Sequence, residues 1–446
     1  PTWASDVRPR QAPIVVLGTL AGAHMLMALV LLQSPWISTV AALAVLAWGL
    51  VLAARPSTSH QAIYVAAYLA TADVLWRMTG ARVFWEYGKY SVVLLLLVIA
   101  FTRGIHRGLT DWAALYFILF LPSAIATLQF FGLTRDLRTA LSFNLSGPFS
   151  LAVAVAFFAG IRRVESLDLT RLMTWMLMPI IGVFTIALHS TVTATSLVFD
   201  TNANFVTSGG FGPNQVAALL SLGVLLALIL AFNSRDPMLR LGALGVAGVL
   251  QLQSFLTFSR GGTFNVLVAL AFLGVHYVSH QRARWIFVTV MVGVLVVGAL
   301  VVLPQLDAWT AGNLSTRFTS LDTTGRQALA EADLDLLKEH PVLGVGPGMA
   351  KYQRRDIRHY GVAPHTEFTR ALAEHGMFGL AGLIVLCLLA FQAYRLAPTA
   401  LSKGWVAGLV AWSLAEMTHS AMRIVAISFV FGLACLPFHR WGRPES

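Results

Sequence analysis

Charged residues are scarce in this chain of 446 residues. Asp, Glu, Lys and Arg together make up 11% of the sequence, whereas an ordinary soluble domain carries about 25%. Hydrophobic residues make up 57%, and the mean hydropathy is +0.73. One core surrounded by water cannot bury so many apolar side chains, so the surplus needs lipid as its solvent. The composition excludes a conventional soluble enzyme, a disordered chain and a collagen-like repeat, and it predicts an all-α integral membrane protein.

Cysteine is nearly absent. Cys387 and Cys435 both lie in apolar runs, and their spacing forms neither a redox pair nor a metal cluster, so we interpret them as packing residues. The His and Cys residues do not have zinc spacing. Asp333 and Asp335 would point about 200° apart on a helix and cannot hold one ion together. The sequence therefore predicts no metal and no cofactor.

Acidic residues are outnumbered by basic ones. The chain has 31 Lys and Arg against 20 Asp and Glu, a net charge of +11. A basic surplus favours anionic partners, which here are lipid headgroups, phosphates or both. We expect membrane lipids among the partners and no nucleic acid.

Apolar runs that could cross a bilayer recur along the chain, where a spanning helix needs roughly 20 residues. Several are short or carry a charge, so we predict about 12 transmembrane helices within a range of 12–14. The fourteen candidates are 13–32, 36–54, 61–78, 90–102, 111–131, 141–160, 172–198, 214–232, 239–258, 264–279, 285–303, 376–394, 404–419 and 424–438. The predicted domains are an N-terminal transmembrane bundle over 1–303, one large helical loop over 304–375 and C-terminal transmembrane helices over 376–446.

The distribution of Lys and Arg indicates the orientation. If the chain alternates sides from a cytoplasmic N-terminus, sixteen of these residues lie on the cytoplasmic side and seven on the other side, outside the long loop. Cytoplasmic loops carry the excess of positive charge, so we predict that both termini are cytoplasmic. A loop longer than about 60 residues translocates largely regardless of its charge. The loop 304–375 is therefore predicted to face outward.

Arginine at the outward face runs against this bias and needs a reason, because a charge near hydrocarbon costs about a few kcal/mol. Arg260 lies between two spans in Ser259-Arg260-Gly261-Gly262, whose glycines allow another backbone or a ligand to approach. Two interpretations stay open for Arg260: a side chain that snorkels from a turn, or one that binds an anion.

Arg326 follows Thr323-Thr324-Gly325. Thr324 and Gln327 fit a capping box ahead of an apolar repeat with helical spacing, which predicts a helix that begins here. The helix macrodipole disfavours a cation in the first turn. Arg326 is explained if an anion is bound between its side chain and the free backbone N–H groups; an ordinary surface arginine is the alternative.

Glycines mark two further segments. His340-Pro341-Val342-Leu343-Gly344-Val345-Gly346-Pro347-Gly348 matches neither a dinucleotide fingerprint nor a P-loop, so we predict a tight structural bend with Gly346 as a supporting residue. In Phe211-Gly212-Pro213-Asn214-Gln215, Pro213 is placed to be the first residue of a helix. Asn214 is a candidate polar lining residue of the same outer face.

His365 lies in Pro364-His365-Thr366-Glu367, just before an apolar run. At a helix start the dipole lowers the pKa of an imidazole, which then stays neutral and can accept a proton. A lone histidine is more often structural, and Glu367, Glu374 and His375 compete for the role of base. The choice between His365 and Glu367 stays open.

A basic cluster lies between these motifs. Lys351, Arg354, Arg355 and Arg358 have the spacing of one helix face, if the segment is helical. Such a face fits a phosphorylated acceptor or anionic lipid equally well.

In this order the motifs resemble the O-antigen ligase family, membrane glycosyltransferases that share a superfamily with O-antigen polymerases. The resemblance covers about residues 255–380 and is carried by Ser259-Arg260-Gly261, Thr324-Gly325-Arg326, His340-Pro341 with Gly344-Val345-Gly346-Pro347-Gly348, and His365 with Glu374-His375-Gly376. It implies a GT-C-like fold in the bacterial inner membrane, with a periplasmic active site. The implied reaction moves an O-antigen glycan from undecaprenyl diphosphate to lipid A–core and completes lipopolysaccharide.

Carried over by position, Arg260 and Arg326 bind the donor diphosphate, and His365 acts on the acceptor hydroxyl. The family is metal-independent, and two arginines can stabilise the leaving diphosphate in place of a metal. Attack from the opposite face predicts inversion at the anomeric carbon. The candidate acceptor-binding residues are Lys351, Arg354, Arg355 and Arg358, and the candidate supporting residues are Glu367, Asn214 and Gly346.

Two alternatives remain. An O-antigen polymerase would use the same donor with a second lipid-linked glycan as acceptor. A transporter or flippase predicts ionisable residues within the spans and repeat symmetry. These spans are nearly free of charge, so the transporter is the less favoured alternative.

Overall fold

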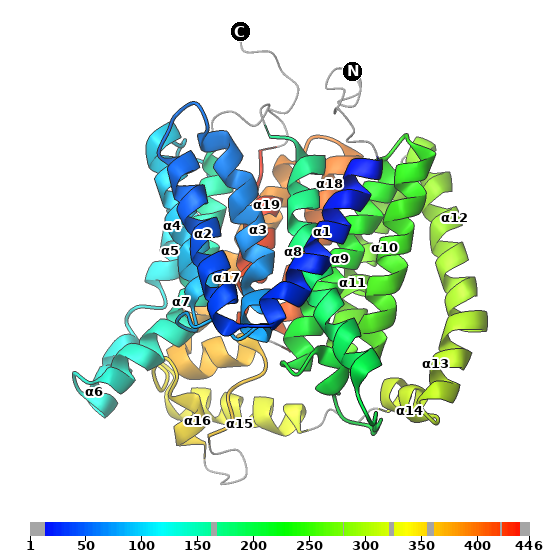
Figure 1. Ribbon diagram of the computed structural model, residues 1–446. Coiled ribbons are helices and arrows are strands. Elements are labelled where there is room, and N and C mark those ends of the chain that lie inside the picture. The colour runs from blue at the N-terminus through cyan, green and yellow to red at the C-terminus, as the bar shows by residue number, and fades with distance from the viewer. Residues whose placement is uncertain are drawn as a thin grey trace.

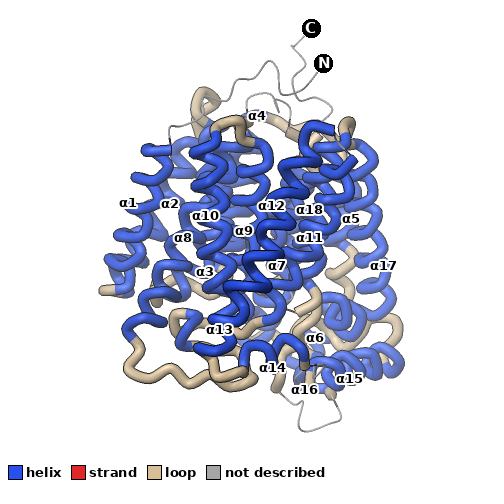
Figure 2. Tube along the Cα trace, turned by 90° about the vertical axis from the view of Figure 1, so that its right-hand side faces the viewer, coloured by secondary structure: helices blue, strands red, loops and turns tan. Residues whose placement is uncertain are grey.

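The computed structural model describes residues 14–161, 167–279, 281–320, 325–354, 361–419 and 422–437. Every regular element within these ranges is a helix, apart from one isolated β-bridge between Ile105 and Ile161. Long helices stand side by side in one bundle (Figures 1 and 2). The all-α integral membrane protein predicted from composition is confirmed.

The bundle is built by three stretches of the chain. The first contributes α1 (Ile14–Leu32), α2 (Pro35–Ala53), α3 (Ser59–Met78), α4 (Tyr87–Arg103), α5 (Thr110–Ile118), α7 (Arg135–Gly160) and α8 (Leu169–Thr193). The second contributes α9 (Pro213–Asn233), α10 (Pro237–Leu256), α11 (Arg260–Ser279) and α12 (Gln281–Val297). The third contributes α17 (Glu367–Leu396), α18 (Ala400–Met417) and α19 (Val425–Ala434).

Nine helices in the described part of the chain are long and apolar enough to cross a membrane by length and composition. They are α1, α2, α7, α8, α9, α10, α11, α17 and the helix that runs from α12 to Trp309. The other bundle helices are shorter or more polar, yet they pack against these: α3 lies against α8, α5 and α19 against α7, and α18 against α11. The helix α9 is buried along most of its length, whereas α12 lies at the rim (Figure 1).

One predicted span is wrong. The apolar run 111–131 is broken into α5 and α6 (Ala124–Phe131). Pro122 lies in the break, and proline kinks or breaks a helix because it lacks the N–H and its ring clashes with the preceding turn. The helix α6 leaves the bundle and protrudes from one end (Figure 1).

Short helices gather at that same end of the bundle, which we call the loop end (Figure 1). They are α13 (Leu303–Trp309), α14 (Asn313–Thr319), α15 (Arg326–Glu339) and α16 (Ala350–Gln353), with a 3₁₀ turn, η2, over Val206–Ser208. A π-helical turn, η3 (Gly298–Val302), joins α12 to α13. The helix α17 has non-helical backbone at Gly376, where φ is 58°. Its first two turns therefore belong to the loop end and the remainder to the bundle.

Candidate functional site

Arg260 and Asn214 lie at the starts of neighbouring helices. Pro213 is the first residue of α9, as predicted, and Asn214 Oδ1 accepts a hydrogen bond from Ser259 Oγ at 2.8 Å. Arg260 is the first residue of α11, and its Nη1 donates to the carbonyl oxygen of Ser320 at 2.6 Å. These contacts join α9, α11 and the segment after α14 at the loop end.

Arg326 is the first residue of α15, within the first turn where the sequence places it, and it is half-buried. The N-cap is Gly325, with a φ of 77°, so the predicted capping box does not start the helix at Thr324, which lies outside the described residues. Burial lowers the pKa of Arg326, the charge of Arg260 lowers it further, and Glu416 opposes the shift. Two arginines at two helix N-termini therefore lie close enough to repel each other.

A buried carboxylate, that of Glu416, lies near Arg326. Glu416 on α18 is 1% exposed and accepts a hydrogen bond from Asn265 Nδ2, while Asn265 Oδ1 bonds to His419 Nε2 at 2.8 Å. A Cβ at Gly261 would lie 2.5 Å from the His419 ring, so the glycine after Arg260 allows α11 to lie against it. Sequence reasoning missed Glu416 and His419, although an acidic residue near the end of the apolar run 404–419 is a signal.

His365 lies just before α17 and is half-buried. Its Nδ1 is buried and has no hydrogen-bond partner within the described residues. The pKa of His365 falls to about 4, first because of burial and then because of the charges of Arg423, Arg326 and Arg354. The predicted direction is confirmed, but burial and these three cations cause it. At neutral pH the imidazole is uncharged and has a nitrogen that can accept a proton.

Glu367 is the alternative candidate for the base, and its carboxylate already accepts several hydrogen bonds. It is 2% exposed, its two carboxylate oxygens accept from Nε and Nη2 of Arg370, and Oε2 also accepts from the backbone N–H of Met422. Arg370 Nη1 binds Glu374 at 3.0 Å. One guanidinium is thus held by two carboxylates inside the protein.

The glycine-rich segment is the predicted tight bend. Gly344, Gly346 and Gly348 all have positive φ, and the N–H groups of Val345 and Gly346 donate to backbone carbonyls at 2.9 Å in the first part of α17. A Cβ at Gly346 would lie 2.5 Å from Thr127 Oγ1 and 2.7 Å from the Thr127 backbone nitrogen. Glycine is required here because the bend packs backbone to backbone between α6 and α17.

The predicted basic helix face is wrong in its geometry. The helix α16 ends at Gln353, and Arg354 has an extended backbone. The Arg354 side chain turns inward, where Nε and Nη2 donate to Asp333 Oδ1 at 2.9 and 2.7 Å. Lys351 lies over the Tyr352 ring. Arg355 and Arg358 lie outside the described residues.

The aspartates of α15 point apart, as predicted. Asp333 is fully buried with Arg354, whereas Asp335 is exposed and pairs with Lys338 at 2.7 Å. Across the ranges that the structure describes, no group of three or more His, Cys, Asp and Glu residues is placed to hold a metal ion. Cys387 is exposed and Cys435 is buried, and both are free thiols.

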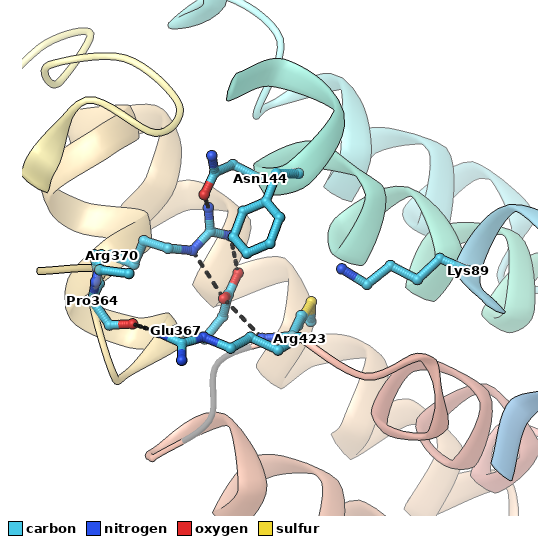
Figure 3. A pocket seen from close by; sticks show the side chains of 9 residues that line it. Lys89, Asn144, Pro364, Glu367, Arg370 and Arg423 are labelled. Carbon is cyan, nitrogen blue, oxygen red and sulfur yellow. Dashed lines mark hydrogen bonds and ion pairs between the residues drawn. The ribbon is translucent and has the colours of Figure 1, made fainter. Parts of the chain in front are cut away.

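A pocket adjoins His365. It encloses about 350 Å³ of empty space, part of it open to solvent, and is lined by Lys89, Phe143, Asn144, Ala363, Pro364, Glu367, Arg370, Met422 and Arg423. Figure 3 shows Lys89 extending from α4 toward a hydrogen-bonded group on the opposite wall. Arg423 Nη2 in that group donates to the carbonyl oxygen of Pro364 at 2.8 Å.

Fold and site together describe a multi-pass membrane protein with a basic, partly buried site at one end of its helices. Residues 247–384, from α10 into α17, match the family model described as O-antigen ligase. The match covers less than half of the chain and includes Arg260, Arg326 and His365, and it confirms the resemblance. It supports the O-antigen ligase and polymerase superfamily and, at a coarse level, a glycosyltransferase-like activity. No curated protein matches the chain.

Proposed function

We propose that the protein is an O-antigen ligase: an inverting, metal-independent glycosyltransferase that moves O-antigen from undecaprenyl diphosphate to lipid A–core. The reaction takes place at the periplasmic face of the inner membrane, where the loop end lies, and both termini are cytoplasmic. One observation carries the proposal. Arg260, Arg326 and His365 gather at one end of a membrane bundle, inside the segment that matches the family.

Arg260 and Arg326 bind the donor diphosphate. Each begins a helix, so backbone N–H groups and the positive end of the helix dipole lie beside each guanidinium. The repulsion that lowers the pKa of Arg326 is relieved when an anion lies between the two side chains. As the anomeric bond breaks, negative charge develops on the leaving diphosphate, and the two guanidinium groups stabilise it through charge-assisted hydrogen bonds.

His365 is the base. The acceptor hydroxyl transfers its proton to the imidazole as the oxygen attacks the anomeric carbon, and the Nδ1 of this ring has no partner among the described residues. Attack on the face opposite the diphosphate inverts that carbon. Glu367 is disfavoured as the base because its carboxylate already accepts hydrogen bonds from Arg370 and Met422. A general base contributes about 10² to 10⁴ in rate.

A transfer assay with purified protein tests the proposal. Undecaprenyl-diphosphate glycan is supplied with lipid A–core or with a lipid-linked glycan, in the presence of EDTA. We expect product on lipid A–core that is lost in Arg260→Ala, Arg326→Ala and His365→Ala and kept in Lys338→Ala, which removes an exposed cation from α15.

The other outcomes are equally informative. Extension of the lipid-linked glycan alone would identify an O-antigen polymerase. Activity abolished by EDTA would contradict metal independence. Transfer at the full rate by His365→Ala would exclude His365 as the base, and no transfer to either acceptor would favour the transporter.

A further inference from the structure

Lys89 is a buried cation that the proposed mechanism does not use. It is the third residue of α4, is 2% exposed and lines the pocket beside His365. Its ammonium group has three donors, and the hydrogen bond it makes is to Ser146 Oγ at 3.2 Å. Within the described ranges, no carboxylate forms an ion pair with it. A buried charge without a counter-ion is unfavourable unless a ligand supplies one.

The carboxylates near Lys89 form ion pairs with other cations. Asp73 pairs with Arg77 at 3.0 Å, and its Oδ2 also accepts from the N–H of Val425. Glu367 is bound by Arg370, as described above. Among the described residues, the pocket therefore contains one guanidinium in ion pairs with carboxylates and a lysine without such a pair.

Arg423 is the second pocket cation without a carboxylate partner in the described part of the chain. Its backbone is held by Arg77, whose Nη1 and Nη2 reach the Arg423 carbonyl oxygen at 3.4 Å. Its side chain reaches the Pro364 carbonyl oxygen. Lys89 from α4 and Arg423 from the segment before α19 thus line one cavity with Asn144, whose amide is a further polar group (Figure 3).

We propose that this pocket is a phosphate-binding subsite, in which Lys89 and Arg423 bind a phosphoryl group carried by one of the two glycan substrates. The inference rests on the proposed function for the identity of those substrates. Part of the pocket is open to solvent, so a phosphoryl group can enter it. Because Ala363 and Pro364 form part of its wall, a sugar anchored here lies next to His365.

The phosphoryl group has two sources: the diphosphate of the donor, or a phosphate on a sugar of the acceptor. Equilibrium binding to the full chain in detergent separates them without any transfer step. The probes are farnesyl diphosphate, a phosphorylated core oligosaccharide and the same oligosaccharide after dephosphorylation. The variants are Lys89→Met, which keeps the length and removes the charge, Lys89→Arg, which keeps the charge, and Lys338→Met as the exposed control.

We expect Lys89→Met to weaken binding of one phosphate probe by roughly 10- to 100-fold, as for loss of a hydrogen bond to a charged group. Lys89→Arg should retain part of the affinity, and Lys338→Met all of it. Weaker farnesyl diphosphate binding identifies the donor as the source. Weaker binding of the phosphorylated core, with the dephosphorylated core unaffected, identifies the acceptor. Arg423→Met gives an independent variant if Lys89→Met does not fold.

Wild-type affinity of folded Lys89→Met and Arg423→Met for all three probes would overturn the subsite. This failure is distinct from failure of the proposed function. If the wild type transfers glycan and its binding of these probes does not depend on Lys89, the proposed function stands and the subsite is refuted. If binding of a phosphate probe depends on Lys89 but the wild type transfers glycan to neither acceptor, the subsite stands and the proposed function is refuted.

Discussion

Arg423 donates a hydrogen bond from Nη2 to the carbonyl oxygen of Pro364 at 2.8 Å, and this links the entry to α19 with the residue before His365. A second link is close by, because the N–H of Met422 donates to Glu367. The proposed base is therefore positioned by the last helix of the bundle as well as by its own segment.

The charge of Arg423 should be visible in the pH profile. It lowers the pKa of His365, so Arg423→Gln should raise that pKa. His365 must be neutral to accept a proton, so activity falls as the pH drops through its pKa. The acidic limb of kcat/KM, expected near pH 4 in the wild type, should move to higher pH in Arg423→Gln. Arg240→Gln, at the start of α10, is the control; a limb that stays in place would contradict the assignment.

Donor binding should also change the pKa of His365. A bound diphosphate neutralises the charge of Arg326, which contributes to the low pKa of His365. The pKa of His365 should therefore be higher in the enzyme–donor complex than in the free protein. At saturating donor, the acidic limb of kcat should lie at higher pH than that of kcat/KM. Coincident limbs would show that the diphosphate binds too far from His365 to affect it.

The ion pair between Arg354 and Asp333 should dominate the stability of the loop end. Both side chains are almost fully buried, and removing one partner of such a pair costs about 3–5 kcal/mol. Arg354→Met should lower the Tm in detergent far more than Lys338→Met, which breaks an exposed pair worth about 0.2–1 kcal/mol. The double variant Arg354→Met with Asp333→Leu should recover much of the loss. Equal Tm values for the two single variants would refute the argument.

Gly346 should not tolerate a side chain. Its φ of 96° costs an alanine about 1–3 kcal/mol, and the Cβ would also collide with the backbone of Thr127. Gly312 also has a positive φ of 79° but open space around it, so Gly312→Ala measures the conformational cost alone. We expect a clearly lower Tm for Gly346→Ala than for Gly312→Ala, together with reduced transfer. Similar Tm values would mean that the bend can move away from α6.

Local patterns predicted much of the molecule. The fold class follows from composition and from apolar runs, which are visible in the local order of residues. The start of α9 at Pro213 follows from the preference of proline for the first helical position, and the sequence places Arg326 in the first turn of α15. The prediction of one span over 111–131 was wrong because mean hydropathy does not register a single proline. The helix is broken at Pro122.

The functional residues that the sequence did not reveal escaped detection for one reason. Lys89, Glu416 and Arg423 come from three distant segments, and each looks like a single charge at the edge of an apolar run. The spacing of Arg354 suits a basic helix face, whereas its partner Asp333 lies 21 residues away in the chain. Pairings of this kind depend on how helices pack and leave no local periodicity.

Hydropathy, charge and short motifs were enough to indicate that the chain crosses a membrane and that Arg260, Arg326 and His365 are the residues to test. These properties depend on composition and on neighbours within a few positions. Which cations form ion pairs, by contrast, became visible from the packing of distant segments. Arg370 is held by two carboxylates, whereas Lys89 and Arg423 line an open pocket beside His365. The reason is physical: the energy of a charge depends on its burial and on the charges around it, and packing of distant segments sets both.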